Sequence, residues 1–141
     1  MLASGRPLPS GSALIITAHP DDECMFFLPT IVSLVADGTP VHLLCLSTGD
    51  ADGLGAVRRQ ELSHACSLLG VKDIDTMVID DAGLPDGLTN RWPPEAVAVH
   101  VVAAIAAFEP ASVRWSVPLR CRTWSQAGAQ FARGPFVGTC S

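Results

Sequence analysis

Residues Ala13 to Phe27 read A-L-I-I-T-A-H-P-D-D-E-C-M-F-F, an apolar run interrupted by a polar cluster. The first part, residues 13–18, predicts a buried strand of a parallel sheet. This strand ends in one imidazole and three carboxylates within residues 19–23, directly before a second apolar run. Because ligands bind beyond the carboxyl ends of the strands in open α/β sheets, the cluster falls where a functional site is expected.

The cluster has the chemistry of a metal site. Pro20 fixes its own φ and biases His19 toward an extended backbone, so the turn is stiff and its side chains diverge. His and Asp are both ordinary ligands for zinc. The alternative is a turn in which one Asp caps the following helix and Glu23 is stabilised by the positive N-terminal end of the helix dipole. Capping accounts for one Asp and leaves the other Asp and His19 unexplained, so the pattern favours a site.

Composition limits the classes of protein. The chain has 141 residues, 48% hydrophobic and 16% charged, which indicates a single globular domain with a large core. A net charge of −5 argues against a nucleic-acid surface. No apolar run is long enough to span a bilayer, and no secretory signal pattern is present. The five Cys lack a C-x-x-C spacing and are interpreted as reduced thiols: Cys24, Cys45, Cys66, Cys121 and Cys140.

Strands alternate with helices along the chain. After the first strand, the pattern predicts the following elements: a helix at 26–36, a strand at 41–47, a helix at 57–69, a strand at 76–79, a helix at 95–108 and a short strand at 112–117. Three successive strand–helix units predict an α/β fold, Rossmann-like, with three α/β/α layers and a mostly parallel sheet. The turn after the first strand lacks G-x-G-x-x-G, so a dinucleotide site is not expected.

The charge balance changes near Glu109. All 14 acidic residues lie at or before this position, whereas four of the nine basic residues follow it. We therefore divide the chain into a flexible lead-in at 1–12, a core at 13–109 and a divergent basic tail at 110–141. The alternative for the tail is a basic surface loop with a last strand of the same sheet.

The motifs resemble one known family. A-H-P-D-D-E, followed by L-L-C-L-S-T-G-D, R-R-Q-E-L and V-I-D-D with P-D downstream, resembles the LmbE-like zinc-dependent N-deacetylases. Within them the chain is most similar to the eukaryotic N-acetylglucosaminyl-phosphatidylinositol de-N-acetylases. The resemblance covers residues 13–109 and implies an incomplete core of that fold. It also implies removal of an acetyl group from an N-acetylglucosaminyl lipid or glycoside, in GPI-anchor biosynthesis.

The resemblance also implies a cofactor, roles for residues and a location. Zinc would be held by His19 and Asp22, with Asp21 as the general base. The residues assigned to substrate binding on the same basis are Arg58, Glu61, Asp50 and Asp80. The location implied is the cytosolic side of the endoplasmic reticulum, whereas the chain alone suggests the cytoplasm. Peripheral association with a membrane is left open, and no nucleic-acid partner is expected.

One family feature is missing from the sequence. The family supplies a third zinc ligand, a His from beyond the fourth strand, and no His follows His100 here. The patterns around His42, His64 and His100 are those of packed or solvated side chains rather than ligands. Two functions therefore stay open: an active zinc hydrolase, and a catalytically inactive truncated or variant family member.

Overall fold

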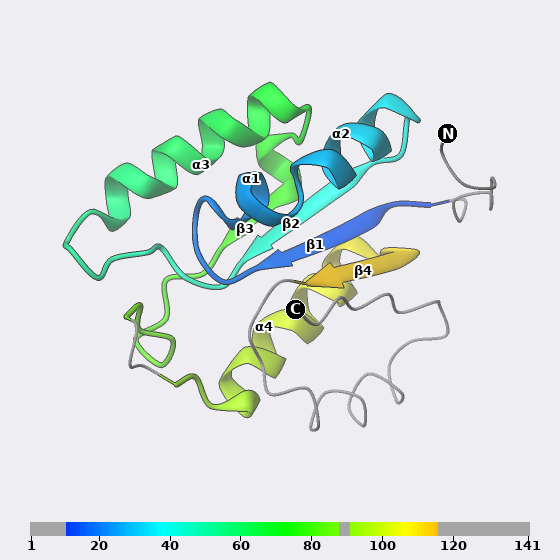
Figure 1. The fold of residues 1–141 in the computed structure, drawn as a ribbon. Helices are drawn as coiled ribbons and strands as arrows, with labels where there is room; N and C mark the ends of the chain where they lie inside the picture. Colours follow the sequence, from blue (N-terminus) through cyan, green and yellow to red (C-terminus); the bar gives the residue numbers. More distant parts are fainter. Residues whose placement is uncertain (1–10, 88–90, 116–141) are drawn as a thin grey trace.

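A parallel four-stranded sheet forms the centre of the computed structural model (Figure 1). The structure describes residues 11–87 and 91–115. The sheet has the order β3-β2-β1-β4, and every neighbouring pair is parallel. The strands are β1 (Ala13–Thr17), β2 (Val41–Cys45), β3 (Thr76–Val78) and β4 (Ser112–Trp115). The predicted α/β class with a parallel sheet is confirmed.

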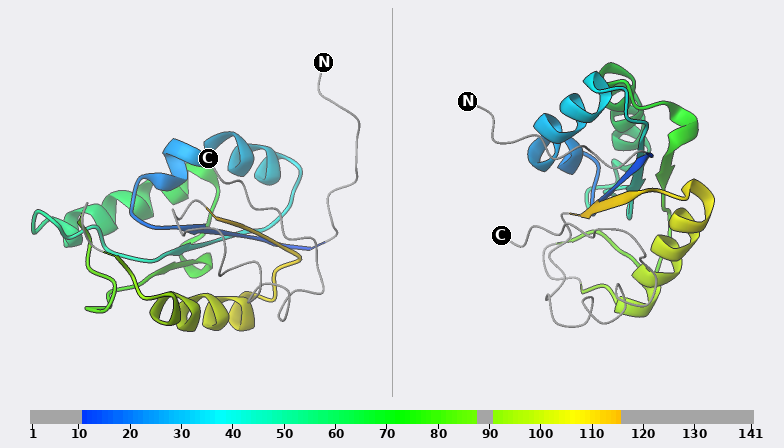
Figure 2. Two further views of the ribbon diagram at one scale, coloured as in Figure 1. Left: turned by 60° about the horizontal axis from the view of Figure 1, so that its bottom comes forward. Right: turned by 90° about the vertical axis from the view of Figure 1, so that its right-hand side faces the viewer.

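Helices cover both faces of the sheet. They are α1 (Asp22–Phe26), α2 (Leu28–Ala36), α3 (Gly55–Leu69) and α4 (Pro94–Phe108), with a 3-10 turn at Asp73–Asp75. Helices α1, α2 and α3 lie on one face and α4 lies on the other, as the two views of Figure 2 show. The result is the predicted three-layer arrangement.

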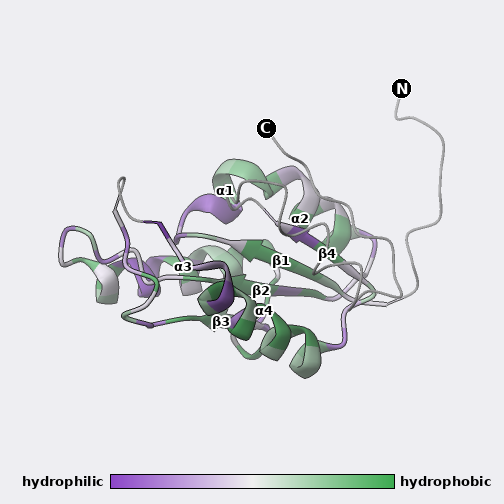
Figure 3. Cartoon of the chain, turned by 90° about the horizontal axis from the view of Figure 1, so that it is seen from below, coloured by the Kyte–Doolittle hydropathy of each residue, from purple (hydrophilic) through white to green (hydrophobic). Residues whose placement is uncertain are grey.

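Side chains that alternate along β1 fill two separate cores. Ala13 and Ile15 belong to the cluster that includes residues of α2 and α3, whereas Leu14 and Ile16 belong to the cluster that includes α4. All four are almost completely buried. Because a strand buried on both faces must be apolar throughout, the uninterrupted run in the sequence is explained. Figure 3 shows hydrophobic residues along the strands and the helices that flank them. Each fully buried Leu or Ile contributes about 1.5–3 kcal/mol.

Two helices follow β1, where the sequence predicted one at residues 26–36: α2 fills most of that range, and α1 is a further helix that lies before it. Helix α1 ends at Phe26, Phe27 joins the two, and α2 begins at Leu28 with Pro29 in its first turn. A proline in the first turn costs no hydrogen bond, whereas deeper in a single continuous helix it would remove one. The break therefore lets a short helix carry the acidic residues at the end of β1.

The last described strand lies beyond the predicted boundary at Glu109. Glu109 adopts a left-handed conformation with φ 45° and ends α4. Strand β4 then pairs with β1, with Ala13 opposite Ser112. The sheet therefore continues past the predicted core, at least to Trp115. Cys121 and Cys140 lie outside the described residues.

Two other sequence-level interpretations concern thiols and the membrane. Cys24, Cys45 and Cys66 form no disulfide bond within the described residues, and Cys24 is exposed whereas the other two are buried. Burial raises the pKa of the Cys45 thiol to about 12. Within the described residues, no helix has the length and apolar character that crossing a bilayer requires.

Candidate functional site

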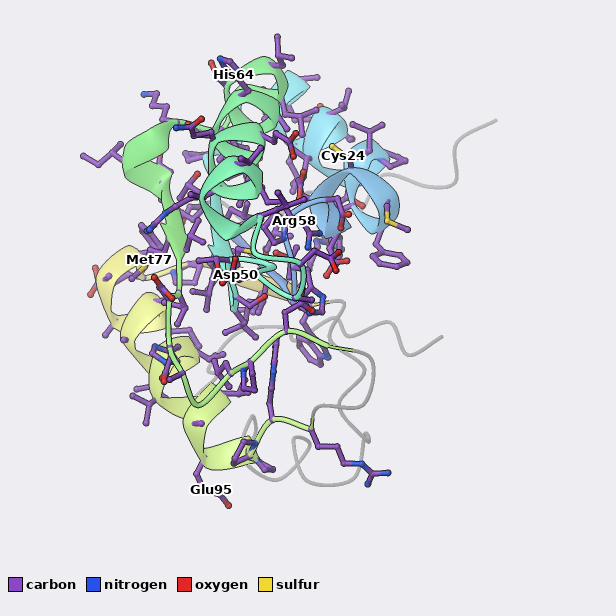
Figure 4. All side chains as sticks on the ribbon, turned by 90° about the vertical axis from the view of Figure 1, so that its left-hand side faces the viewer. Cys24, Asp50, Arg58, His64, Met77 and Glu95 are labelled. Atoms are coloured by element: carbon purple, nitrogen blue, oxygen red, sulfur yellow. The ribbon has the colours of Figure 1, made fainter. Side chains whose placement is uncertain are left out.

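The polar residues that follow β1, β2 and β3 meet at one edge of the sheet. Residues 19–23 follow β1, residues 48–55 follow β2 and residues 80–87 follow β3. Since all the strands are parallel, their carboxyl ends lie at the same edge. Arg58, in the first turns of α3, and Asp50, just before it, lie close to each other in Figure 4. This edge is therefore the candidate site.

Two buried carboxylates fix the turn after β1. Asp22 is 8% exposed, and its Oδ2 accepts hydrogen bonds from the backbone N–H groups of Ala18 at 2.9 Å and His19 at 3.1 Å. Glu23 is 2% exposed, and its Oε2 accepts a hydrogen bond from the backbone N–H of Asp21 at 2.9 Å. Because these oxygens accept hydrogen bonds from backbone N–H groups of the turn, both side chains hold its backbone in one conformation.

Asp21 differs from its two neighbours. It stands before the first residue of α1, with φ 104° and ψ −25°, and its side chain makes no capping hydrogen bond. The side chain is 59% exposed, and its Oδ2 lies 3.3 Å from Nη2 of Arg58. A non-glycine residue at positive φ stores strain of order 1–3 kcal/mol. The capping role considered as an alternative is thus absent for Asp21, and its carboxylate faces solvent at the candidate site.

Arg58 joins the three loops. Its Nη2 donates to the carbonyl oxygen of Pro20 at 2.8 Å, and its Nη1 donates to that of Gly49 at 2.9 Å. Nη1 also lies 3.4 Å from Oδ2 of Asp86 in the loop after β3. Gly49 has φ 70°, and a Cβ at this position would overlap the Arg58 guanidinium. The close approach of Arg58 to the backbone therefore requires glycine at position 49.

Asp86 is a site residue that the predictions did not assign. Its Oδ1 lies 2.8 Å from Nε2 of His19, and its side chain is 13% exposed. The ring of Trp92 lies beside His19, with ring centroids 5.6 Å apart. The only signal for Asp86 in the sequence was the P-D pair among the motifs, and Trp92 had none. Both residues reach the site through the loop after β3, whose path the sequence pattern does not define.

The remaining candidate substrate-binding residues lie at different places. Oδ1 of Asp50 accepts a hydrogen bond from the backbone N–H of Gly55 at 2.7 Å, so this side chain orders the start of α3. Glu61 is exposed on α3, one turn after Arg58. Asp80 is exposed just beyond β3. The structure therefore brings Arg58 into direct contact with Asp21, whereas no such contact joins Glu61 or Asp80 to the turn after β1 among the described interactions.

Comparison with known proteins identifies the family. Residues 14–119 match the family PIG-L: GlcNAc-PI de-N-acetylase. The chain belongs to this family. The match includes the edge of the sheet that carries His19, Asp21 and Arg58, and it extends beyond β4. The resemblance inferred from the motifs is thus confirmed.

Individual members of the PIG-L family are similar to the chain over part of their length. A probable N-acetylglucosaminyl-phosphatidylinositol de-N-acetylase of Schizosaccharomyces pombe is 48% identical over 91 residues, which are 64% of this chain and 37% of the relative. The Bos taurus N-acetylglucosaminyl-phosphatidylinositol de-N-acetylase is 41% identical over 95 residues, 67% of this chain and 38% of the relative. The chain thus spans somewhat more than a third of the length of these relatives.

A solved structure shares the fold. The N,N'-diacetylchitobiose deacetylase from Pyrococcus horikoshii, in complex with an inhibitor, superposes with a TM-score of 0.59 at 26% sequence identity. The superposition covers 79% of this chain and 44% of the deacetylase. The described sheet and helices therefore have the arrangement found in a deacetylase.

Two of the candidate residues carry atoms that could bind zinc. His19 and Asp22 offer an imidazole nitrogen and a carboxylate oxygen, which suit zinc chemically. Across residues 11–87 and 91–115, however, no group of three or more His, Cys, Asp or Glu side chains is placed to hold a metal ion. A catalytic zinc needs three protein ligands and one open position. The described residues by themselves therefore do not complete a zinc site.

The other histidines have different surroundings from His19. Nδ1 of His42 lies 2.9 Å from Oδ1 of Asp75, and its ring stacks on Phe108. Nε2 of His100 lies 2.8 Å from Oδ2 of Asp81. His64 is exposed on α3, far from Arg58 in Figure 4. These environments agree with the interpretation of all three as packed or solvated residues.

Proposed function

We propose that this chain is a zinc-dependent hydrolase that removes the acetyl group from an N-acetylglucosaminyl compound, most specifically N-acetylglucosaminyl-phosphatidylinositol in GPI-anchor biosynthesis. The observation that carries the proposal is the placement of Asp21. Its exposed carboxylate stands in a strained backbone conformation between His19 and Asp22, at the carboxyl edge of a deacetylase fold. The relatives that are named as de-N-acetylases of this lipid support the substrate class.

In this proposal each side chain has a defined task. Asp21 accepts a proton from the water that attacks the acetamide carbon, since it is exposed and makes no capping bond. Arg58 holds the Asp21 carboxylate toward the open side of the site. The exposed carboxylates Glu61 and Asp80 would bind sugar hydroxyls, and Asp50 would keep the loop before α3 in place for the same purpose.

We assign zinc as the cofactor and His19 and Asp22 as two of its ligands. Zinc, when bound, polarises a carbonyl and lowers the pKa of a bound water. The location proposed is the cytosolic side of the endoplasmic reticulum, where a lipid substrate would require peripheral contact with a membrane. The location is the one that the family resemblance implies, and the names of the relatives support only a phosphatidylinositol lipid as the substrate.

The alternative is a catalytically inactive member of the family. The specific observation in its favour is that no three donors meet at the described part of the site. In this case the chain would fold but would not catalyse deacetylation, and Asp21 would have no role in catalysis. The two functions make opposite predictions for one assay.

The deciding assay measures acetate released from N-acetylglucosaminyl-phosphatidylinositol by the purified 141-residue chain with added zinc. We expect release above the level without protein, and a loss on the order of 10²–10⁴-fold in Asp21→Asn. The control is Asp37→Asn, an exposed carboxylate at the end of α2, which should retain the full rate. Equal rates for Asp21→Asn and the wild type would reject the role of Asp21 as the base. No release by the wild type would favour the inactive member.

A further inference from the structure

Asp86 bridges two side chains of the candidate site. One carboxylate oxygen, Oδ1, lies 2.8 Å from Nε2 of His19, and the other, Oδ2, lies 3.4 Å from Nη1 of Arg58. Asp86 is the least exposed member of this group, at 13%, compared with 32% for His19 and 27% for Arg58. The loop after β3 therefore reaches across the edge of the sheet and holds the imidazole that follows β1.

This contact determines which ring nitrogen of His19 carries the proton. A carboxylate can only accept a hydrogen bond, whereas a neutral imidazole has one N–H donor and one nitrogen with a lone pair. At 2.8 Å, Nε2 must be the donor to Oδ1 of Asp86. In a neutral His19 the proton is thus held on Nε2, and Nδ1 keeps the lone pair.

We propose that Asp86 is a positioning residue, which fixes His19 in the Nε2–H tautomer and presents Nδ1 as its coordinating nitrogen. The inference rests on the role of His19 in the proposed function and adds the atom through which His19 acts. A carboxylate that accepts the second N–H of a metal-binding histidine raises the basicity of the ligand nitrogen and fixes the orientation of the ring. Asp86 stands in that relation to His19.

Trp92 restricts the same ring from a second direction. Its ring is tilted by 53° to that of His19, with 5.6 Å between the centroids. The Nε1–H of Trp92 donates to the carbonyl oxygen of Pro85 at 2.8 Å, so the indole is tied to the residue next to Asp86. The imidazole is consequently held by a hydrogen bond at its edge and by an aromatic ring beside it, both from one loop.

The first test measures the tautomer of His19 by long-range proton–nitrogen NMR of the nitrogen-15-labelled full chain. At about pH 8, above the ordinary imidazole pKa of about 6.5, the neutral ring dominates in model compounds. We expect the two ring nitrogens of wild-type His19 to resonate as one protonated and one unprotonated nitrogen. In Asp86→Ala both should move toward the averaged pattern of the exposed His64.

A matched control exists in the same chain. His100 faces Asp81 through Nε2 at 2.8 Å, the distance found for His19 and Asp86. Asp81→Ala should therefore change the ring nitrogens of His100 and leave those of His19 unchanged, and Asp86→Ala should do the opposite. The signals are assigned by substituting each histidine with Gln. Unchanged nitrogen shifts of His19 in a folded Asp86→Ala would overturn the proposal.

The second test measures zinc affinity by titration of the full chain with zinc alone. We expect Asp86→Ala to weaken zinc binding about 10–100-fold, the usual effect of removing such a partner. Asp86→Asn keeps an oxygen acceptor, so it should retain the His19 tautomer and lie between the wild type and Asp86→Ala in affinity. Equal affinities in the wild type and Asp86→Ala would contradict the positioning role.

The two tests separate this inference from the proposed function. If the wild type binds no zinc and releases no acetate but shows the expected His19 tautomer, the proposed function fails and the orienting contact of Asp86 stands. If zinc binds and acetate is released while Asp86→Ala leaves both the nitrogen shifts and the affinity unchanged, the proposed function stands and the role of Asp86 is rejected.

Discussion

At the scale of single residues, adjacent acids of the turn after β1 serve different purposes. Asp22 and Glu23 are buried and accept backbone hydrogen bonds, whereas Asp21 is exposed and strained. The sequence predicted that neighbouring carboxylates would diverge, and they do. It did not predict that Asp22, assigned as a metal ligand, also holds the backbone of Ala18 and His19. That task depends on the path of the turn, which the residue pattern does not specify.

The strain at Asp21 can be measured by comparing two substitutions. Asp21→Gly and Asp21→Ala both remove the carboxylate, but only glycine relaxes at φ 104°. We expect the glycine variant to have a free energy of unfolding about 1 kcal/mol higher than the alanine variant. The matched pair is Asp37→Gly and Asp37→Ala at φ −78°, where alanine should be the more stable. Urea unfolding of the four variants checks this. If the alanine variant were the more stable one at both positions, Asp21 would not be strained.

At the scale of elements, the strands and helices follow from the sequence more closely than the loops do. The apolar runs predicted the four strands of the described residues, and Gly70 ends α3 in the left-handed conformation that is typical of a glycine after a helix. The break between α1 and α2 was not predicted, because residues 25–28 are all apolar and contain no signal that ends a helix. Asp86 was not assigned because its contact with His19 joins loops distant in sequence.

The loop after β2 offers a test of how Arg58 is held. Gly49 and Gly53 have nearly equal positive φ, 70° and 72°, but a Cβ would overlap Arg58 only at Gly49, since nothing lies within 4 Å at Gly53. Both Ala variants should lose stability through backbone strain. Gly49→Ala should lose about 1–3 kcal/mol more, because it displaces a charged donor from its acceptors. Urea unfolding checks this, and in an Arg58→Ala background the difference should disappear. If the difference in stability between the two Ala variants remained in the Arg58→Ala background, a contact other than Arg58 would be its cause.

The loop after β3 has a contact that depends on pH. Oδ1 of Asp81 accepts the N–H of Gly83 at 2.8 Å, and this bond, with His100, holds the pKa of Asp81 below its usual range. A carboxyl group whose pKa is lower in the folded state than in the unfolded state stabilises the folded protein at pH values above the unfolded-state pKa. This stabilisation is lost as the pH falls through the folded-state pKa. The loss of stability between about pH 5 and pH 3 should therefore be smaller in Asp81→Asn than in the wild type. Thermal melts across this range check it, with Asp37→Asn as the control, and identical slopes would contradict it.

At the scale of the whole molecule, the fold and the site are specified to different degrees. The described residues contain the four-stranded sheet and a hydrophobic core on each of its faces. Apolar patterns of a few residues each were sufficient to predict this α/β fold and the edge where its loops meet. The zinc ligands form a set that must converge from several strands. His19 and Asp22 come from a single turn, and the described residues add no third donor to them. Patterns within one motif therefore indicate the edge of the sheet where a site is expected, but they do not give a complete set of ligands.

For the whole chain we predict that any zinc bound at the proposed site is held weakly. Metal affinity depends on the full ligand set and on the groups that orient it, so a site resting mainly on His19 and Asp22 should exchange its zinc readily. Stabilisation by a ligand follows RT ln(1 + [L]/Kd), so a weakly bound ion stabilises the fold only at concentrations above its Kd. We therefore expect the melting temperature to rise gradually as the zinc concentration is increased. Dialysis against a chelator should remove both the zinc and this stabilisation, and His19→Ala should show neither. His64→Ala, on the exposed face of α3, is the control and should behave as the wild type does. Zinc that stays bound at one ion per chain after such dialysis would instead show that a third donor completes the site.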